Sequence, residues 1–159
     1  MRHATIVGIF TVMLTLAPGL VFAENVIDDS KNPGYLFVLS ATSGSLKGDT
    51  LTLNGVPNVI YFSDRPHRIA GHLSLEKFVE SWNKGVYSYK ADPPSATLSV
   101  LKKDGAENVV FELNSVEQKS GSVDFKVVVL EGVEKVATSF NAGTLFIDIF
   151  GGYPDRPPD

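Results

Sequence analysis

The stretch ATLSVLKKDGAENVVFEL, residues 96–113, decides the fold. Its first part alternates apolar and polar residues, with Leu98 and Val100 on one side, which is the period of a half-buried strand. Residues 103–105, KDG, are typical of a hairpin turn, after which residues 109–113 return as a second strand. A strand followed directly by its antiparallel neighbour argues against a parallel sheet with helical crossovers.

The same alternation of strands and turns extends to both sides of this hairpin. Apolar, β-branched and aromatic residues, which favour strands, recur between glycine-rich or polar turn segments. The other expected strands are residues 35–40, 50–53, 59–62, 123–130, 136–140 and 144–150. This spacing predicts a mostly β fold, either an antiparallel β-sandwich or a sandwich-like barrel, formed as a single domain by residues 35–150.

One segment has the period of a helix instead. Four apolar residues fall at positions i, i+3, i+4 and i+7 and therefore share one helical face, namely Leu75, Phe78, Val79 and Trp82. Ser74 suits the N-cap, and Gly85 is placed to end the helix. We expect one α-helix that packs on the sheet through this apolar face.

The N-terminal residues follow the order of a secretory signal peptide. Arg2 gives a basic start, residues 4–16 carry no charge, and residues 21–23, VFA, fit a peptidase cleavage site. The apolar run is shorter than the roughly 20 residues that a membrane span needs. We predict a signal peptide over residues 1–23 and no membrane span after its removal, with an uncleaved anchor as the alternative.

The segments beside the domain, and the missing cysteines, bear on localisation. We expect residues 24–34 to be a flexible lead-in and residues 151–159, rich in glycine and proline, to be a disordered tail. The chain has no cysteine, which excludes disulfides, thiol catalysis and thiolate metal sites. An exported domain of this kind suits a bacterial protein that is periplasmic or secreted.

The charge of the chain excludes one class of partner. The formal net charge is −4, and the longest basic run is Lys102-Lys103. Loss of Arg2 with the signal peptide would make the mature domain more negative still. Nucleic-acid binding needs a concentrated positive face, so we expect no nucleic-acid partner.

The densest group of polar side chains lies between residues 59–62 and the helix. Four of its members are candidate ligand-binding residues: Arg65, His67, Arg68 and His72. Arginine binds carboxylate or phosphate through two parallel hydrogen bonds, and the N–H groups at a helix start also attract anions. A metal site would need Asp64 beside the two histidines, but two arginines would repel the cation, so we expect no metal and no cofactor.

The last expected strand carries a lone carboxylate, Asp148, between Phe146 and Phe150. We expect Asp148 to be at least partly buried, and a buried carboxylate needs a hydrogen-bonded partner. Arg65 or Arg68 is the expected partner. In that case the arginine would form a structural ion pair with Asp148 that fixes the loop to the sheet, and the arginines would not form a ligand site.

Several blocks of sequence resemble a group of small secreted bacterial proteins of unassigned function. The blocks are YFSDRP at 61–66 with Gly71, then Phe78 and Trp82, DPPSA at 92–96, and LFID at 145–148. Together they span most of residues 35–150. The resemblance implies no activity, cofactor or catalytic residue.

Three function classes follow. The first is an exported, non-enzymatic interaction or structural module with an unknown macromolecular partner. The alternative is a module that binds a small anion or other ligand at the Asp64–His72 junction. A hydrolase has the least support, because Ser63, Asp64 and His67 have the residue types of a triad but no enzyme motif is present. Apolar area exposed on a sheet face would favour the first class, and a cavity with converging arginine and histidine the second.

Overall fold

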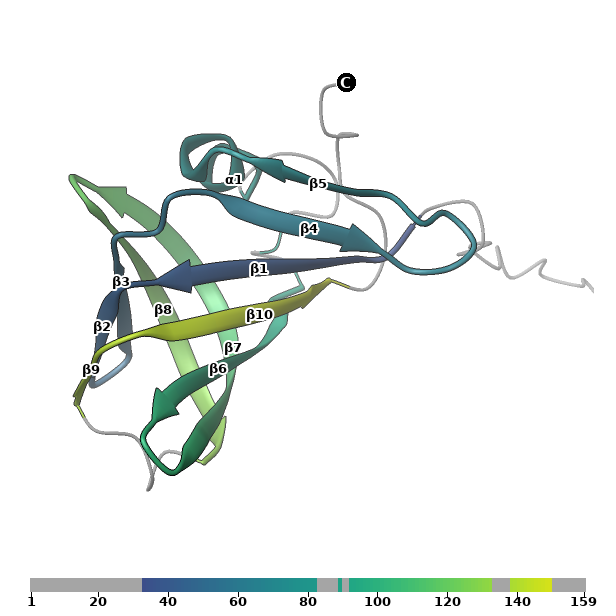
Figure 1. Cartoon of the computed structure of the whole chain (residues 1–159). Coiled ribbons are helices and arrows are strands. Elements are labelled where there is room, and N and C mark those ends of the chain that lie inside the picture. The colour runs from purple at the N-terminus through teal and green to yellow at the C-terminus, as the bar shows by residue number, and fades with distance from the viewer. Residues whose placement is uncertain (1–32, 83–88, 90–91, 133–137, 150–159) are drawn as a thin grey trace, which may run out of the picture.

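The computed structural model describes residues 33–82, 89, 92–132 and 138–149 (Figure 1). The elements are β1 Tyr35–Ala41, β2 Ser43–Lys47, β3 Thr50–Asn54, β4 Val59–Ser63, β5 Ala70–Leu73, α1 Leu75–Trp82, β6 Ser95–Lys102, β7 Gly105–Lys119, β8 Ser122–Glu131, β9 Ser139–Phe140 and β10 Gly143–Ile149. The described strands pair antiparallel in the order β5-β4-β1-β10-β6-β7-β8-β3-β2-β9. The expected mostly β fold with one helix is therefore confirmed.

Several of the expectations from sequence concern residues that the structure does not describe. The signal peptide at 1–23, most of the lead-in at 24–34, the helix end at Gly85 and the tail at 151–159 lie outside the described residues. Within the described part of the chain, no helix combines the length and the hydropathy that a membrane crossing requires.

The strand ladders close into a ring, so the fold is a barrel and not two separate sheets. β1 and β2 are two halves of one bent strand, since β10 and β9 pair with them in one continuous register: Ala41 with Gly143, then Gly44 with Phe140. β2 also pairs with β3, and the series β3, β8, β7, β6 and β10 leads back to β1. Because the inward face of each strand is apolar, the closed ring encloses one core.

Two glycines make room for an aromatic ring at the seam between β2, β9 and β10. A Cβ on Gly44 would lie 2.6 Å from the Thr52 carbonyl oxygen and far too close to the ring of Phe140. A Cβ on Gly143 would lie 2.9 Å from the same ring. Phe140 is buried there, so the bent strand can close only because both positions lack a side chain.

The helix α1 begins where the sequence predicts. The Ser74 Oγ accepts a hydrogen bond from the Lys77 N–H at 3.2 Å, and the Ser74 carbonyl accepts one from the Phe78 N–H at 3.1 Å. Such a cap satisfies N–H groups that have no partner within the helix. A helix of eight residues is nevertheless too short to be stable alone, so packing must hold it.

Aromatic side chains supply that packing. Phe78 and Trp82 are fully buried, and the Phe78 ring lies 5.5 Å from the ring of Phe37 in β1. The Trp82 ring lies 6.1 Å from the ring of Phe125 in β8. β1 and β8 do not pair with each other, so α1 links two walls of the barrel across its interior.

The hairpin β4–β5 extends the wall beside the barrel ring. It pairs with the N-terminal part of β1, on the side opposite β10, where the bend of β1 into β2 leaves that edge free (Figure 1). The ring of Tyr61 lies over Gly71, since a Cβ on Gly71 would meet the Tyr61 Oη at 2.5 Å. The short strands β2 and β5 are not predicted by the sequence pattern.

Candidate functional site

Three of the four candidate ligand residues lie on the loop that joins β4 to β5, at the end of the hairpin that projects from the barrel (Figure 1). Main-chain and hydroxyl hydrogen bonds close this loop: the Ser63 N–H donates to the Ile69 carbonyl at 2.8 Å, and the Ile69 N–H donates to the Ser63 Oγ at 2.7 Å. Arg65 and Arg68 are both exposed at its surface. Arg68 has a φ of 52°, in the left-handed region.

His67 lies against another residue of the same loop, Asp64. Its side chain is partly buried, and its Nδ1 lies 3.8 Å from Asp64 Oδ1, too far for a direct hydrogen bond. The Ser63 hydroxyl donates to the Asp64 carbonyl at 3.3 Å and accepts a hydrogen bond from a main-chain N–H. Both hydrogen bonds of this hydroxyl are therefore made to the backbone. The residue types of a hydrolase triad are present here, but these bonds do not arrange them as one.

The expected burial of Asp148 is wrong. On β10 the inward-facing side chains include Leu145 and Ile147, whereas Phe146 and Asp148 face outward and Asp148 is exposed. The described ion pairs do not join Asp148 to Arg65 or Arg68. The flanking aromatic residues suggest burial only if that face is covered, and along β10 it is not.

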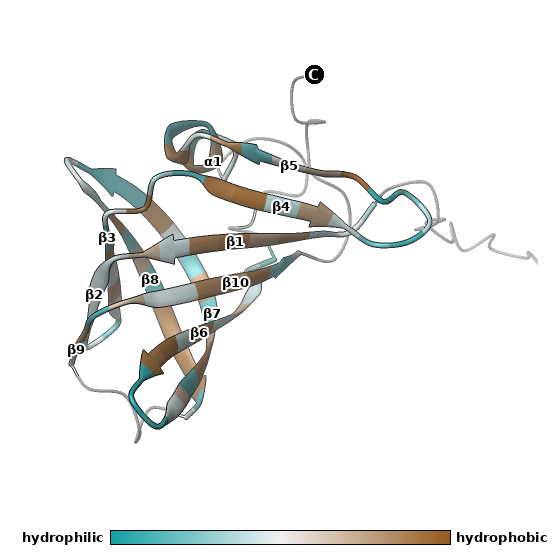
Figure 2. Ribbon diagram, viewed as in Figure 1, coloured by the Kyte–Doolittle hydropathy of each residue, from teal (hydrophilic) through white to brown (hydrophobic). Residues whose placement is uncertain are grey.

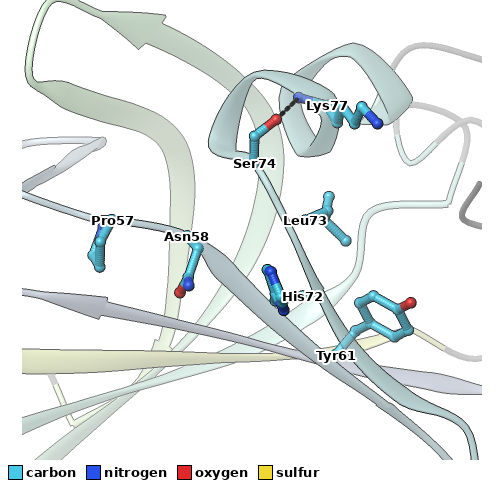
Figure 3. A pocket seen from close by; sticks show the side chains of 7 residues that line it. All are labelled: Pro57, Asn58, Tyr61, His72, Leu73, Ser74 and Lys77. Carbon is cyan, nitrogen blue, oxygen red and sulfur yellow. Dashed lines mark hydrogen bonds between the residues drawn. The ribbon is translucent and has the colours of Figure 1, made fainter.

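His72 is separated from the arginines by the length of β5. It pairs opposite Ile60 and is exposed. It lines a shallow pocket of about 400 Å³ together with Pro57, Asn58, Tyr61, Leu73, Ser74 and Lys77 (Figure 3). In Figure 3 the Lys77 side chain extends away from His72. The structure thus divides the predicted site into an arginine loop and a separate pocket with a single histidine.

The residues that the structure describes offer no place for a metal ion. Nowhere among them do three or more histidine, aspartate or glutamate side chains gather closely enough to hold one. Asp64 and His67 belong to the loop, and His72 lies at the opposite end of β5.

A surface that is not among the sites expected from the sequence lies on the outward face of β4, β1 and β10. Its members are cross-strand neighbours, because Leu36 pairs with Phe62, and Val38 pairs with both Ile60 and Phe146. We call these five residues the outer apolar patch. Four of them are well exposed: Leu36 at 37%, Phe146 at 38%, Ile60 at 40% and Phe62 at 45%.

The three strands that carry the patch are rich in apolar residues. Figure 2 shows hydrophobic residues along β4, β1 and β10, which lie side by side on one wall. A strand with one solvated face normally alternates apolar and polar residues, but β1 reads YLFVLSA and β4 reads VIYFS. That near-continuous apolar run is the signal in the sequence that could have revealed the patch.

Polar residues border part of the outer apolar patch. On the β5 side, His72 pairs with Ile60, whereas the residue that pairs with Phe62 is the small apolar Ala70. On the β10 side, Asp148 pairs with Leu36. At one end, Ser40 and Thr144 face each other, with their hydroxyl oxygens 3.5 Å apart. The patch is therefore an apolar area with polar residues along much of its border.

The candidate site with the most distinctive geometry is thus this apolar area, with the arginine loop and the His72 pocket next to it. No protein-family model, curated protein or solved structure matches the chain.

Proposed function

We propose that the protein is an exported, non-enzymatic interaction module that binds a macromolecular partner through the outer apolar patch. The observation that carries the proposal is the contiguity of five apolar side chains on three neighbouring strands, of which four are more than a third exposed. Contact with a partner would remove this area from water, which is favourable in proportion to the apolar area buried. Patches of this kind commonly mark interaction surfaces.

The export part of the proposal rests on the N-terminal residues. The basic start, the uncharged run and the VFA sequence at 21–23 have the order that a signal peptidase reads, and the cysteine-free chain suits an oxidising compartment. N-terminal sequencing of the protein recovered from the periplasm or the medium tests this. We expect a chain that begins at Glu24, and recovery of the intact N-terminus would contradict export by cleavage.

Crosslinking tests the surface. A photoreactive phenylalanine analogue at position 62 lies within the patch, and the same analogue at Gln118 lies on an exposed position of β7 away from it. We expect position 62 to give a discrete adduct in the producing cell and position 118 to give none. Equal or absent adducts at both positions would refute the assignment of the patch as the binding surface.

A small-ligand module is the second candidate, favoured by the pocket beside His72. Its volume of about 400 Å³ suits a small ligand, and polar groups of Asn58, Ser74 and Tyr61 join His72 in its lining. Calorimetric titration with inorganic phosphate and with simple carboxylates tests this function. Heat that disappears in His72→Ala would support it, whereas heat unchanged by that substitution would place any anion elsewhere.

A further inference from the structure

The borders of the outer apolar patch carry charges of opposite sign. Arg68 lies two residues before Ala70 on the β5 side, and Asp148 lies beside Leu36 on the β10 side. The described salt bridges include neither Arg68 nor Asp148. The other carboxylate near the arginines, Asp64, lies next to His67. One border is therefore cationic and the other anionic, with apolar side chains between them.

The strand register turns this asymmetry into a rule for docking. Two rows of side chains cross the outward face: Ala70, Phe62, Leu36 and Asp148 form one, and His72, Ile60, Val38 and Phe146 form the other. Consider a second copy that docks face to face about a twofold axis, which runs parallel to the strands between β4 and β1. Each row then lies over the same row of the other copy, in the opposite order. Phe62 then lies over Leu36 of the other copy, and Ile60 lies over Val38.

The same operation brings the charged borders together. The β5 border of each copy lies over the β10 border of the other, so Arg68 approaches Asp148 of the second copy, and symmetry forms this contact twice. Arg68 belongs to the loop two residues before Ala70, so its Cα lies within about 7 Å of the Ala70 Cα, a distance that an arginine side chain spans. Aligned packing of two sheet faces places them about 10 Å apart with interleaved side chains, as in β-sandwiches.

From this complementarity we infer that the partner of the outer apolar patch is a second copy of this chain, docked patch to patch about that axis. The inference rests on the proposed function and names its partner. A single face that joins apolar residues at its centre to opposite charges at its two borders is complementary to itself. It would match another protein only if that protein carried the reversed pattern.

Sedimentation of the purified protein tests the inference. We expect a dimer at micromolar concentrations that becomes monomeric in Ile60→Lys, with unchanged far-ultraviolet circular dichroism because Ile60 is exposed. The matched control is Gln118→Lys, which adds the same charge at an exposed position outside the patch and should leave the dimer intact. A monomer at every concentration, or a dimer that persists in Ile60→Lys, would overturn the inference.

Charge reversal tests the docking geometry. Asp148→Arg alone and Arg68→Asp alone each place two like-charged pairs in a homodimer, which should weaken the dimer by about a hundredfold, or tenfold for each pair. Aspartate also tolerates the left-handed conformation at position 68. When the two variants are mixed, both pairs become complementary, so a heterodimer should form with near wild-type affinity. A mixture that stays monomeric would refute the twofold arrangement.

These outcomes separate the inference from the proposed function. A monomeric protein that crosslinks from position 62 to a different protein would overturn self-association and leave the interaction function standing. A monomeric protein with no adduct at position 62 would remove both.

Discussion

Truncation of one buried ring on α1 tests how the helix is held. Phe78 is fully buried, and its ring contacts those of Phe37 at 5.5 Å and Trp82 at 5.8 Å. Phe78→Ala removes these contacts and leaves a cavity, a change that costs about 3–5 kcal/mol at buried sites. Because eight residues cannot sustain a helix in isolation, we expect the loss to fall at the upper end of that range.

Urea denaturation followed by fluorescence measures this loss, since Trp82 is the only tryptophan of the chain. With a urea dependence of about 2 kcal/mol per molar, a loss of about 5 kcal/mol lowers the midpoint by about 2.5 M. Glu76→Ala, on the exposed side of the same helix, is the control and should change stability by less than about 0.5 kcal/mol. A loss below about 1 kcal/mol for Phe78→Ala would refute the view that α1 depends on this contact.

Three further perturbations test the hairpin, the seam and the ion pairs. Gly71→Ala should lower the free energy of unfolding by about 1–3 kcal/mol, because the added methyl group meets the Tyr61 ring. This penalty should shrink in a Tyr61→Ala background. A double-mutant cycle in which the two free-energy changes are additive would contradict the contact. Gly44→Ala should lower the thermal midpoint, since its Cβ would lie 2.6 Å from a main-chain carbonyl oxygen of β3, and an unchanged midpoint would count against the tight seam. Burial raises the pKa of Asp124, but the hydrogen bonds from Lys119 and Thr52, together with the positive charges of Lys119 and Lys126, outweigh burial and lower the pKa of Asp124. This carboxylate therefore stabilises the folded state above the ordinary carboxyl pKa of about 4, and the stability is lost as the pH falls through the lowered pKa. Denaturation measured across that pH range should show a weaker pH dependence of stability in Asp124→Asn than in the wild type.

The elements that local sequence could predict are those whose signals are local. The period of α1, its Ser74 cap and the turn between β6 and β7 all arise from neighbouring residues. β2 and β5 carry no such signal, because SGSLK and AGHL contain glycine and polar residues that are unfavourable in strands. They become strands because β3 and β4 offer them hydrogen-bonding edges, and those edges exist only in the folded sheet.

The predicted site shows the same division. Arg65, His67 and Arg68 stay together because they share one loop, whereas β5 carries His72 away from them. The orientation of Asp148 follows from the alternation along β10, but its exposure depends on whether another element covers that face. Whether another element covers a sheet face depends on tertiary structure, so the aromatic residues that flank Asp148 in sequence could not predict its burial.

The sequence by itself determined a cysteine-free, mostly β chain with one capped helix, because strand period, helix period and cap preference act over a few residues. Only the tertiary structure decided that the strands close into a ring, that α1 links β1 to β8, and that an apolar patch between opposite charges stays open on β4, β1 and β10. These features depend on register and coverage between segments that lie far apart in the chain. They arise only when distant strands have paired.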